Sequence, residues 1–240
     1  MLPENLKKQE LEETERMAKG AGGPFGDFGS YHALLTGKDP RLVSAHAVLD
    51  PAYLASYARQ AKAILRTAGC PAAPRILDVG CGPGALTDAL AGAFAGAEAL
   101  GVDISTSAIA YAKSRFPACR FAVMAVDEGS VFPGKFDVVH AREFYPFTRT
   151  GDLEFQRRHL RLFTDHLSPG GVILLSLVEG RGRVCGNAEA LGLRKTTMAH
   201  PRLEARLPLG LARLATAAAL RALRRPSFSF YLCLAGGLAG

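Results

Sequence analysis

A buried strand that runs directly into a glycine-rich loop constrains this chain more than any other feature. The segment from Ile76 to Thr87 reads Ile-Leu-Asp-Val-Gly-Cys-Gly-Pro-Gly-Ala-Leu-Thr, with glycines at three alternate positions. Glycine adopts backbone angles that a Cβ forbids and lets a ligand approach the main chain closely. The run from Leu86 to Ala95 then predicts a helix whose N-terminal N–H groups face the same place. The segment therefore predicts a loop that binds a ligand through its backbone.

A second strand and an acid follow at an informative distance. The apolar run from Ala97 to Val102 ends in Asp103, about 20 residues after the glycines, where nucleotide-binding α/β folds place the acid that receives ribose hydroxyls. A glycine pattern alone has a real false-positive rate, and an ordinary strand-to-helix turn is its plain alternative. Strand, loop, helix, strand and acid together form one βαβ unit, which favours a ligand site.

The string Asp78-Val79-Gly80-Cys81-Gly82-Pro83-Gly84 resembles the first motif of the class I S-adenosylmethionine-dependent methyltransferases. A dinucleotide loop also fits formally, but that loop is built to seat a pyrophosphate on a helix N-terminus. Here an acid stands two residues before the first glycine, and a carboxylate disfavours an anion. The resemblance implies that Asp78 helps to hold the methionine amino group of the cofactor, directly or through water.

Further strings of the same family follow in order. Strands are predicted at Phe121–Val126, Phe136–Ala141 and Val172–Leu177. Phe136-Asp137-Val138-Val139 resembles the family's fourth strand, and Leu167-Ser168-Pro169-Gly170-Gly171-Val172 resembles its sharp turn before the fifth. The resemblance is strong from Arg75 to Leu177 and weak outside that range.

The fold class implied by this resemblance is α/β. We expect a Rossmann-like, seven-stranded, mostly parallel sheet with helices on both faces, a reversed last strand and an N-terminal helical extension. A helix at Leu153–Leu167 covers one face, a short helix is expected at Asn187–Leu191, and the reversed strand at Ser227–Leu234.

The resemblance also implies which residues bind the cofactor. Asp103 holds the ribose, and Asp127, after the third strand, accepts a hydrogen bond from the adenine amino group. The full expected cofactor-binding set is Asp78, Gly80, Cys81, Gly82, Gly84, Asp103, Ile104, Asp127, Glu128 and His140.

Candidate catalytic residues are fewer, because methyl transfer is an in-line displacement that needs chiefly alignment. A base matters only for a protonated nucleophile, and His140, at the end of the fourth strand, is the best candidate. A hydrogen-bonded structural histidine is the alternative. Arg142, Glu143 and Tyr145 lie in the next loop, which is expected to face the acceptor. Tyr31 is a further candidate, although it and the aromatic residues of that loop equally suit packing.

Two regions are predicted along the chain: an N-terminal helical extension or lid at residues 1–70, and the methyltransferase domain at residues 71–240. The extension contains helix candidates at Pro3–Lys19, Ser30–Leu35 and Pro51–Ala68. Between the first two, Gly20–Gly29 suits a linker by composition. Its aromatic side chains also suit a lid that closes over a small substrate.

Composition narrows the class further. With 240 residues and 48% apolar content, the chain can bury a full core. It has no apolar run of about 18 residues and no signal-peptide pattern, so a cytoplasmic protein without a membrane partner is expected. Five dispersed cysteines without a CxxC pair predict free thiols, and no metal spacing is present.

The partner expected from the sequence is a small molecule. The net charge of +7 is spread without an aromatic-interleaved basic patch. The loop after the fourth strand also lacks the Asn/Asp-Pro-Pro-Tyr/Phe string of the family's base- and glutamine-methylating branches, so a nucleic-acid partner is not expected. The sequence does not define the oligomeric state and is compatible with a homodimer.

The function expected from these features is transfer of a methyl group from S-adenosyl-L-methionine to an oxygen or nitrogen of a small metabolite, releasing S-adenosyl-L-homocysteine. One alternative is an enzyme that transfers or cyclises the aminocarboxypropyl arm and releases methylthioadenosine. Another is a non-catalytic subunit that binds the same cofactor. The glycine loop predicts binding in all three cases and therefore does not separate them.

Overall fold

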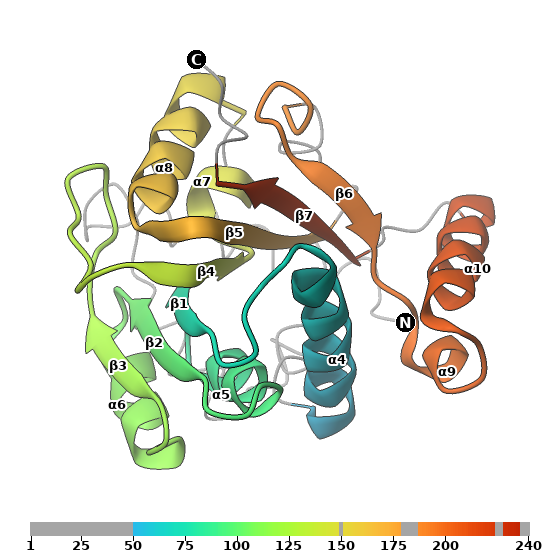
Figure 1. Ribbon diagram of the computed structural model, residues 1–240, viewed down its shortest axis with the longest axis horizontal. Helices are drawn as coiled ribbons and strands as arrows, with labels where there is room; N and C mark the ends of the chain where they lie inside the picture. The colour runs from blue at the N-terminus through green and yellow to red at the C-terminus, as the bar shows by residue number, and fades with distance from the viewer. Residues whose placement is uncertain (1–49, 149–150, 179–186, 224–227, 236–240) are drawn as a thin grey trace, which may run out of the picture.

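A seven-stranded sheet organises the chain, with strand order β3-β2-β1-β4-β5-β7-β6 (Figure 1). The structure is a computed structural model that describes residues 50–148, 151–178, 187–223 and 228–235. The strands are β1 (Arg75–Val79), β2 (Glu98–Asp103), β3 (Arg120–Val123), β4 (Phe136–Arg142), β5 (Leu167–Val178), β6 (Arg194–Thr197) and β7 (Phe228–Leu234). The helices are α4 (Pro51–Thr67), α5 (Ala85–Gly92), α6 (Thr106–Arg115), α7 (Tyr145–Thr148), α8 (Leu153–Asp165), α9 (Pro201–Glu204) and α10 (Leu209–Ala222).

The strand directions confirm the expected topology. Strands β3, β2, β1, β4 and β5 are mutually parallel, whereas β7 runs antiparallel to both β5 and β6. The chain continues from β1 to β2 on one side, and β4 later joins β1 on the other side. Such a reversal of strand order places a ligand crevice at the carboxyl ends of the two strands in open α/β sheets.

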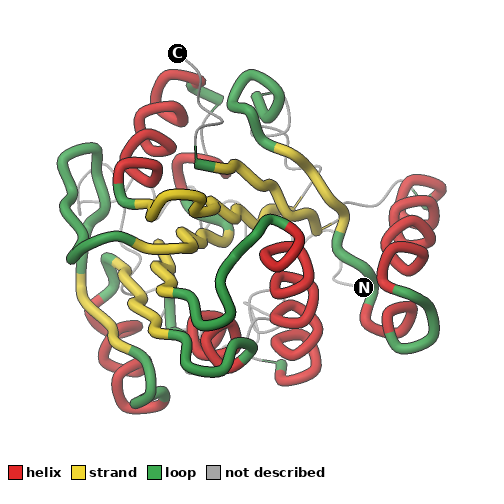
Figure 2. The backbone as a smooth tube through the Cα atoms, in the orientation of Figure 1, coloured by secondary structure: helices red, strands yellow, loops and turns green. Residues whose placement is uncertain are grey.

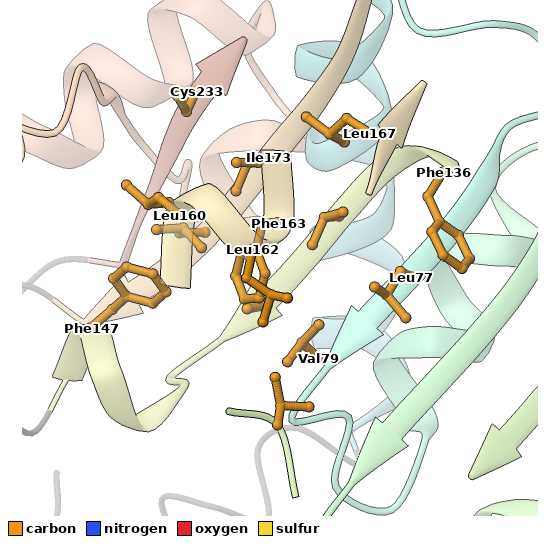
Figure 3. Close-up of a cluster of buried hydrophobic side chains, with 14 of the residues drawn as sticks. Leu77, Val79, Phe136, Phe147, Leu160, Leu162, Phe163, Leu167, Ile173 and Cys233 are labelled. Carbon is orange, nitrogen blue, oxygen red and sulfur yellow. The ribbon is translucent and has the colours of Figure 1, made fainter. Parts of the chain in front are cut away.

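Helices cover both faces of the sheet, as the red and yellow segments of Figure 2 show. One core contains side chains of α8, including Leu160 and Phe163, packed with Leu77 and Val79 of β1 (Figure 3). The other core contains side chains of α4, α5 and α6 together with the alternate strand residues, such as Ile76. Strands buried on both faces explain why the predicted runs are continuously apolar.

Helix α4 matches the helix predicted at Pro51–Ala68. Asp50 caps it, because its carboxylate accepts a hydrogen bond of 2.8 Å from the Ala52 N–H. Pro51 occupies the first turn, where its missing N–H costs nothing. The rest of the expected extension, residues 1–49, lies outside the described residues.

Three sequence expectations about elements are wrong. Asn187–Leu191 forms turns rather than a helix. Leu167–Gly171 is part of β5 rather than a turn before it, because Leu167 pairs with Phe136 and Val172 pairs with Val138. Residues 168–171 of β5 thus lie opposite Asp137 alone and form a β-bulge. The bulge interrupts the regular strand pattern, so the sequence pattern does not reveal this part of the strand. Strand β3 ends at Val123, earlier than predicted.

Candidate active site

The glycine loop after β1 folds back onto the end of β2. The N–H groups of Gly80 and Cys81 both donate to the Val102 carbonyl, at 2.8 and 3.0 Å. Gly80, Gly82 and Gly84 have φ angles of 71°, 52° and 83°, in the left-handed region that side chains with a Cβ rarely adopt. The unusual backbone that the alternate glycines predict is therefore present.

Packing as well as backbone angle requires two of these glycines. A Cβ on Gly84 would lie 2.8 Å from the Cβ of Ala112 and from the Phe121 ring. A Cβ on Gly80 would lie 3.0 Å from the Phe144 ring, which belongs to the loop after β4. The glycine loop thus fits tightly against α6, β3 and the loop after β4.

Asp103 fixes the loop to the carboxyl end of β2. Its Oδ2 accepts a hydrogen bond of 2.9 Å from the Gly82 N–H, and its Oδ1 accepts one of 2.8 Å from the Ser105 N–H. The side chain is buried. Each carboxylate oxygen has two lone pairs, so hydroxyl donors of a ribose suit the same carboxylate. The left-handed glycine backbone and this acid fit an adenosyl group.

A buried hydrogen-bonded chain, the Tyr57–Thr87 relay, joins four residues from four elements. Thr87 Oγ1 donates to Asp78 Oδ2 at 2.5 Å, and Asp78 Oδ1 lies 2.7 Å from His140 Nδ1. The hydroxyl of Tyr57 lies 2.5 Å from His140 Nε2. The relay therefore ties α4, β4, β1 and α5 together behind the glycine loop.

The protonation of the relay follows from its surroundings. Burial raises the pKa of Tyr57 well above its ordinary value, with a further increase from neighbouring Tyr53. The phenol therefore keeps its proton, and its hydroxyl shares a hydrogen bond with His140 Nε2 while Nδ1 shares one with the Asp78 carboxyl group.

This arrangement corrects the expected position of His140. The residue does not end the fourth strand, because β4 continues to Arg142, and its side chain is 0% exposed. Both ring nitrogens lie within hydrogen-bond distance of a described side chain, Nε2 of Tyr57 and Nδ1 of Asp78. Asp78 is likewise almost fully buried, with both carboxylate oxygens bonded.

The loop after β4 reaches the glycine loop through a strained residue. Glu143 has φ = 51°, the only positive φ at a non-glycine residue in the described ranges. Its N–H donates to the Ser176 carbonyl at 2.9 Å, and Phe144 lies against Gly80. A left-handed non-glycine residue costs on the order of 1–2 kcal/mol and is typical of functional loops. Tyr145 follows as the first residue of α7 and is partly buried.

Arg142 lies where this loop begins, among aromatic side chains. Its Nε donates to the Tyr53 hydroxyl at 3.3 Å. Its guanidinium carbon lies 5.8 Å from the centroid of the Tyr53 ring and 5.7 Å from that of Phe228. Tyr53 and Tyr57 stand four residues apart on α4, so one helix face supplies a contact to both Arg142 and His140. That spacing is the sequence signal that could have revealed both tyrosines as site residues.

The remaining expected site residues follow the carboxyl ends of β2 and β3 or lie outside the described ranges. Asp127 Oδ1 accepts hydrogen bonds from the Gly129 N–H and the Ser130 hydroxyl, so it caps its own turn. Glu128 forms an exposed ion pair of 2.6 Å with Arg158. Ile104 follows Asp103 and is partly exposed. Tyr31 belongs to the residues that are not described.

The thiol of Cys81, in the glycine loop, is difficult to ionise. Burial raises the pKa of the Cys81 thiol well above its ordinary value, and the nearby Asp78 and Asp103 raise it further. Cys70, Cys81, Cys119 and Cys233 are all unpaired and buried, which confirms the prediction of free thiols for the four described cysteines. Cys81 is therefore a packing residue of the loop rather than a nucleophile.

The described part of the chain offers neither a metal-binding cluster nor a membrane-spanning helix. It contains no cluster of three or more histidine, cysteine or acidic side chains that could hold a metal ion. None of its helices is long and apolar enough to cross a membrane.

Fold and site together define a Rossmann-like domain with a loop and an acid suited to an adenosyl ligand. Residues 76–171 match the family model described as a methyltransferase domain. The fold is similar to that of a TehB-like SAM-dependent methyltransferase from Corynebacterium glutamicum, with a TM-score of 0.50 and 25% identity. That alignment covers 70% of this chain and 86% of the other.

Curated relatives agree with this result. The chain is 30% identical over 180 residues to a trans-aconitate 2-methyltransferase of Delftia acidovorans, covering 74% of this chain and 61% of the relative. It is 30% identical over 123 residues to the protein of the same name from Variovorax paradoxus, covering 51% and 46%. The chain thus spans about half to three fifths of the length of these relatives. Over the matched residues, the chain is therefore similar to S-adenosylmethionine-dependent methyltransferases.

Proposed function

We propose that this protein transfers a methyl group from S-adenosylmethionine to an oxygen or nitrogen of a small organic molecule. The observation that carries the proposal is the bond between Asp103 and the Gly82 N–H, which fixes a left-handed glycine loop beside an acid. The matched methyltransferase domain and the small organic acid in the relatives' printed names support it.

Each part of the site has a role in this proposal. Asp103 receives the ribose hydroxyls, and Ile104 and Asp127 lie toward the adenine. The glycine loop admits the cofactor close to the main chain, while Asp78 acts by holding Thr87 and His140 in place. Glu143 and Tyr145 lie on the acceptor side, after β4.

The proposed reaction requires little direct chemical participation from these side chains. The bound sulfonium supplies an electrophilic methyl group, and the protein has to align the acceptor and exclude water. The enclosed His140 contributes by positioning the loop and α4. An acceptor that arrives already deprotonated needs no base at all.

Calorimetric titration with S-adenosylmethionine and with S-adenosylhomocysteine tests the proposal. Both are expected to bind, and Asp103→Ala is expected to weaken binding by about tenfold or more, since it removes charge-assisted hydrogen bonds. Asp88→Ala, which removes a partly exposed acid of α5, is the matched control. Failure of both ligands to bind the folded wild type would refute the proposal.

Product analysis separates methyl transfer from its alternatives. Mass spectrometry after incubation with small-molecule fractions of a cell extract should show S-adenosylhomocysteine. Methylthioadenosine would instead indicate use of the aminocarboxypropyl arm. Binding without any turnover would indicate a non-catalytic subunit.

A further inference from the structure

Arg142 carries a charge that forms no ion pair with the described residues. The residue is only partly exposed, yet no carboxylate of the described residues lies within ion-pair distance of its guanidinium. Its only hydrogen bond in that part of the chain is from Nε to the Tyr53 hydroxyl. The two terminal nitrogens have no protein acceptor there.

Withdrawing a guanidinium from water without a counter-charge is costly. The Tyr53 and Phe228 rings offset part of that cost, since a cation–π contact contributes about 0.5–2 kcal/mol. Burial lowers the pKa of Arg142, but neighbouring Tyr53 and Glu143 raise it, with a net increase. The side chain therefore stays positively charged.

The position of Arg142 places this charge on the acceptor side of the site. β4 pairs with β1 so that Ala141 lies opposite Val79, and Arg142 follows at the level of Gly80. On the other side of β4, Arg142 lies opposite Ser176 of β5. Arg142 thus stands at the carboxyl edge of β4, next to the glycine loop and away from Asp103 on β2.

From these observations we propose that Arg142 binds a carboxylate of the acceptor, so that the substrate of this enzyme is a small organic acid. The proposal rests on the proposed methyltransferase function and deepens it. The planar guanidinium presents parallel N–H donors that match a carboxylate bidentately. With Nε bonded to Tyr53, the terminal Nη1 and Nη2 supply the paired donors, while the two rings hold the guanidinium in place.

A carboxylate suits this site better than a phosphate. Arg142 is the only cation contacting the Tyr53 and Phe228 rings among the described residues. A phosphate carries up to two charges and usually takes several donors, often including backbone N–H groups. A single guanidinium group in contact with two aromatic rings matches the charge and planarity of a single carboxylate.

Binding of simple acids to the S-adenosylhomocysteine-saturated protein tests the proposal. The probes are benzoate, succinate and citrate, with benzamide and succinamide as neutral matches and inorganic phosphate as a comparison. We expect the acids to bind and the amides not to bind, by calorimetry. Arg142→Gln should weaken acid binding about tenfold or more. Arg142→Lys should bind the acids with intermediate affinity, because lysine keeps the positive charge but lacks the paired planar N–H donors of the guanidinium.

Arg115→Gln is the matched control, since it makes the same charge change at an exposed position on α6. It should bind the acids as the wild type does. Titration of S-adenosylhomocysteine into Arg142→Gln should give an unchanged affinity, which shows that the variant is folded and that the two sites are separate.

Three results would overturn the proposal: no acid binds the wild type, the acids bind Arg142→Gln as tightly as the wild type, or phosphate is preferred and depends on Arg142. In each case the titration with S-adenosylhomocysteine reports independently on the proposed function. Absence of cofactor binding refutes that function, whereas cofactor binding without Arg142-dependent acid binding refutes only the carboxylate site.

Discussion

Buried polar residues set the geometry of this site. His140 is 83 positions from Tyr57 and 62 from Asp78, yet the three side chains form one enclosed chain of hydrogen bonds. Low local dielectric strengthens such bonds and makes any unpaired member expensive. The histidine that looks like a base in the sequence therefore serves as the connection between α4 and the strand before the glycine loop.

Replacement of Tyr57 by phenylalanine tests the relay. Tyr57→Phe keeps the ring but leaves His140 Nε2 buried without a partner, which should lower the free energy of unfolding by about 1–3 kcal/mol. Urea denaturation at pH 7 measures this change. Tyr111→Phe, at a partly exposed position on α6, is the control and should change stability little. An equal effect of both substitutions would contradict the relay.

The raised pKa of Tyr57 adds a pH dependence to the same comparison. The phenol ionises near pH 10 in the unfolded chain and at higher pH in the folded protein. Its contribution to stability is complete below pH 10 and declines above it, by up to about 1.4 kcal/mol per pH unit. Between pH 9 and 11 the wild type should therefore lose stability more steeply than Tyr57→Phe. Parallel pH curves would contradict the assignment.

At the scale of elements, the glycine loop is bound to its neighbours more tightly than its sequence suggests. Gly84 precedes α5 and packs against a residue of α6 and one of β3. Alternate glycines predict an unusual backbone, but the short distances to Ala112 and Phe121 depend on where two other elements lie. The loop thus packs against two other elements in addition to its proposed role in ligand binding.

Gly84→Ala should destabilise the protein through both effects. The new Cβ would meet carbon atoms at 2.8 Å and would occupy a backbone with φ = 83°. Overpacking of this kind costs about 1–3 kcal/mol, before the backbone strain is added. Gly210→Ala, in α10 with no atom within 4 Å of the added Cβ, should be neutral or stabilising by up to about 1 kcal/mol. Chemical denaturation of the two variants measures the contrast, and equal stabilities would refute the packing argument.

At the scale of the whole molecule, the reversal of strand order at β1 and β4 brings the site together. In the proposed site, the β1–α5 and β2–α6 connections would hold the cofactor, and the loop after β4, α4 and the start of β7 would face the acceptor. Because binding would involve loops from most of the sheet, a bound ligand should stabilise the folded chain as a unit.

Thermal unfolding tests that expectation. S-adenosylhomocysteine at 100 times its dissociation constant should stabilise the protein by about 2.7 kcal/mol. For a chain of this size, that corresponds to an increase of roughly 5–10 °C in the melting temperature. Adenosine, which lacks the amino acid arm, should give a smaller increase at the same concentration. An unchanged melting temperature with the full ligand would contradict the proposed site.

The sequence by itself determined the local parts of this protein. The glycine loop, the acid at the end of β2, the central strands and α4 follow from patterns within about 30 residues, because turn geometry, strand burial and helix capping are local. The seven-stranded order and the reversed last strand came from family resemblance and are confirmed by the pairing of β7.

Only the tertiary structure decided which side chains act together. It enclosed His140 between Tyr57 and Asp78, gave Asp103 its two backbone donors and set Arg142 among Tyr53 and Phe228. Burial and hydrogen-bond partners depend on contacts between distant segments, and no local pattern encodes them. For that reason the sequence predicted the methyl donor, whereas the fold revealed the positive charge of Arg142, to which we assign the binding of the acceptor.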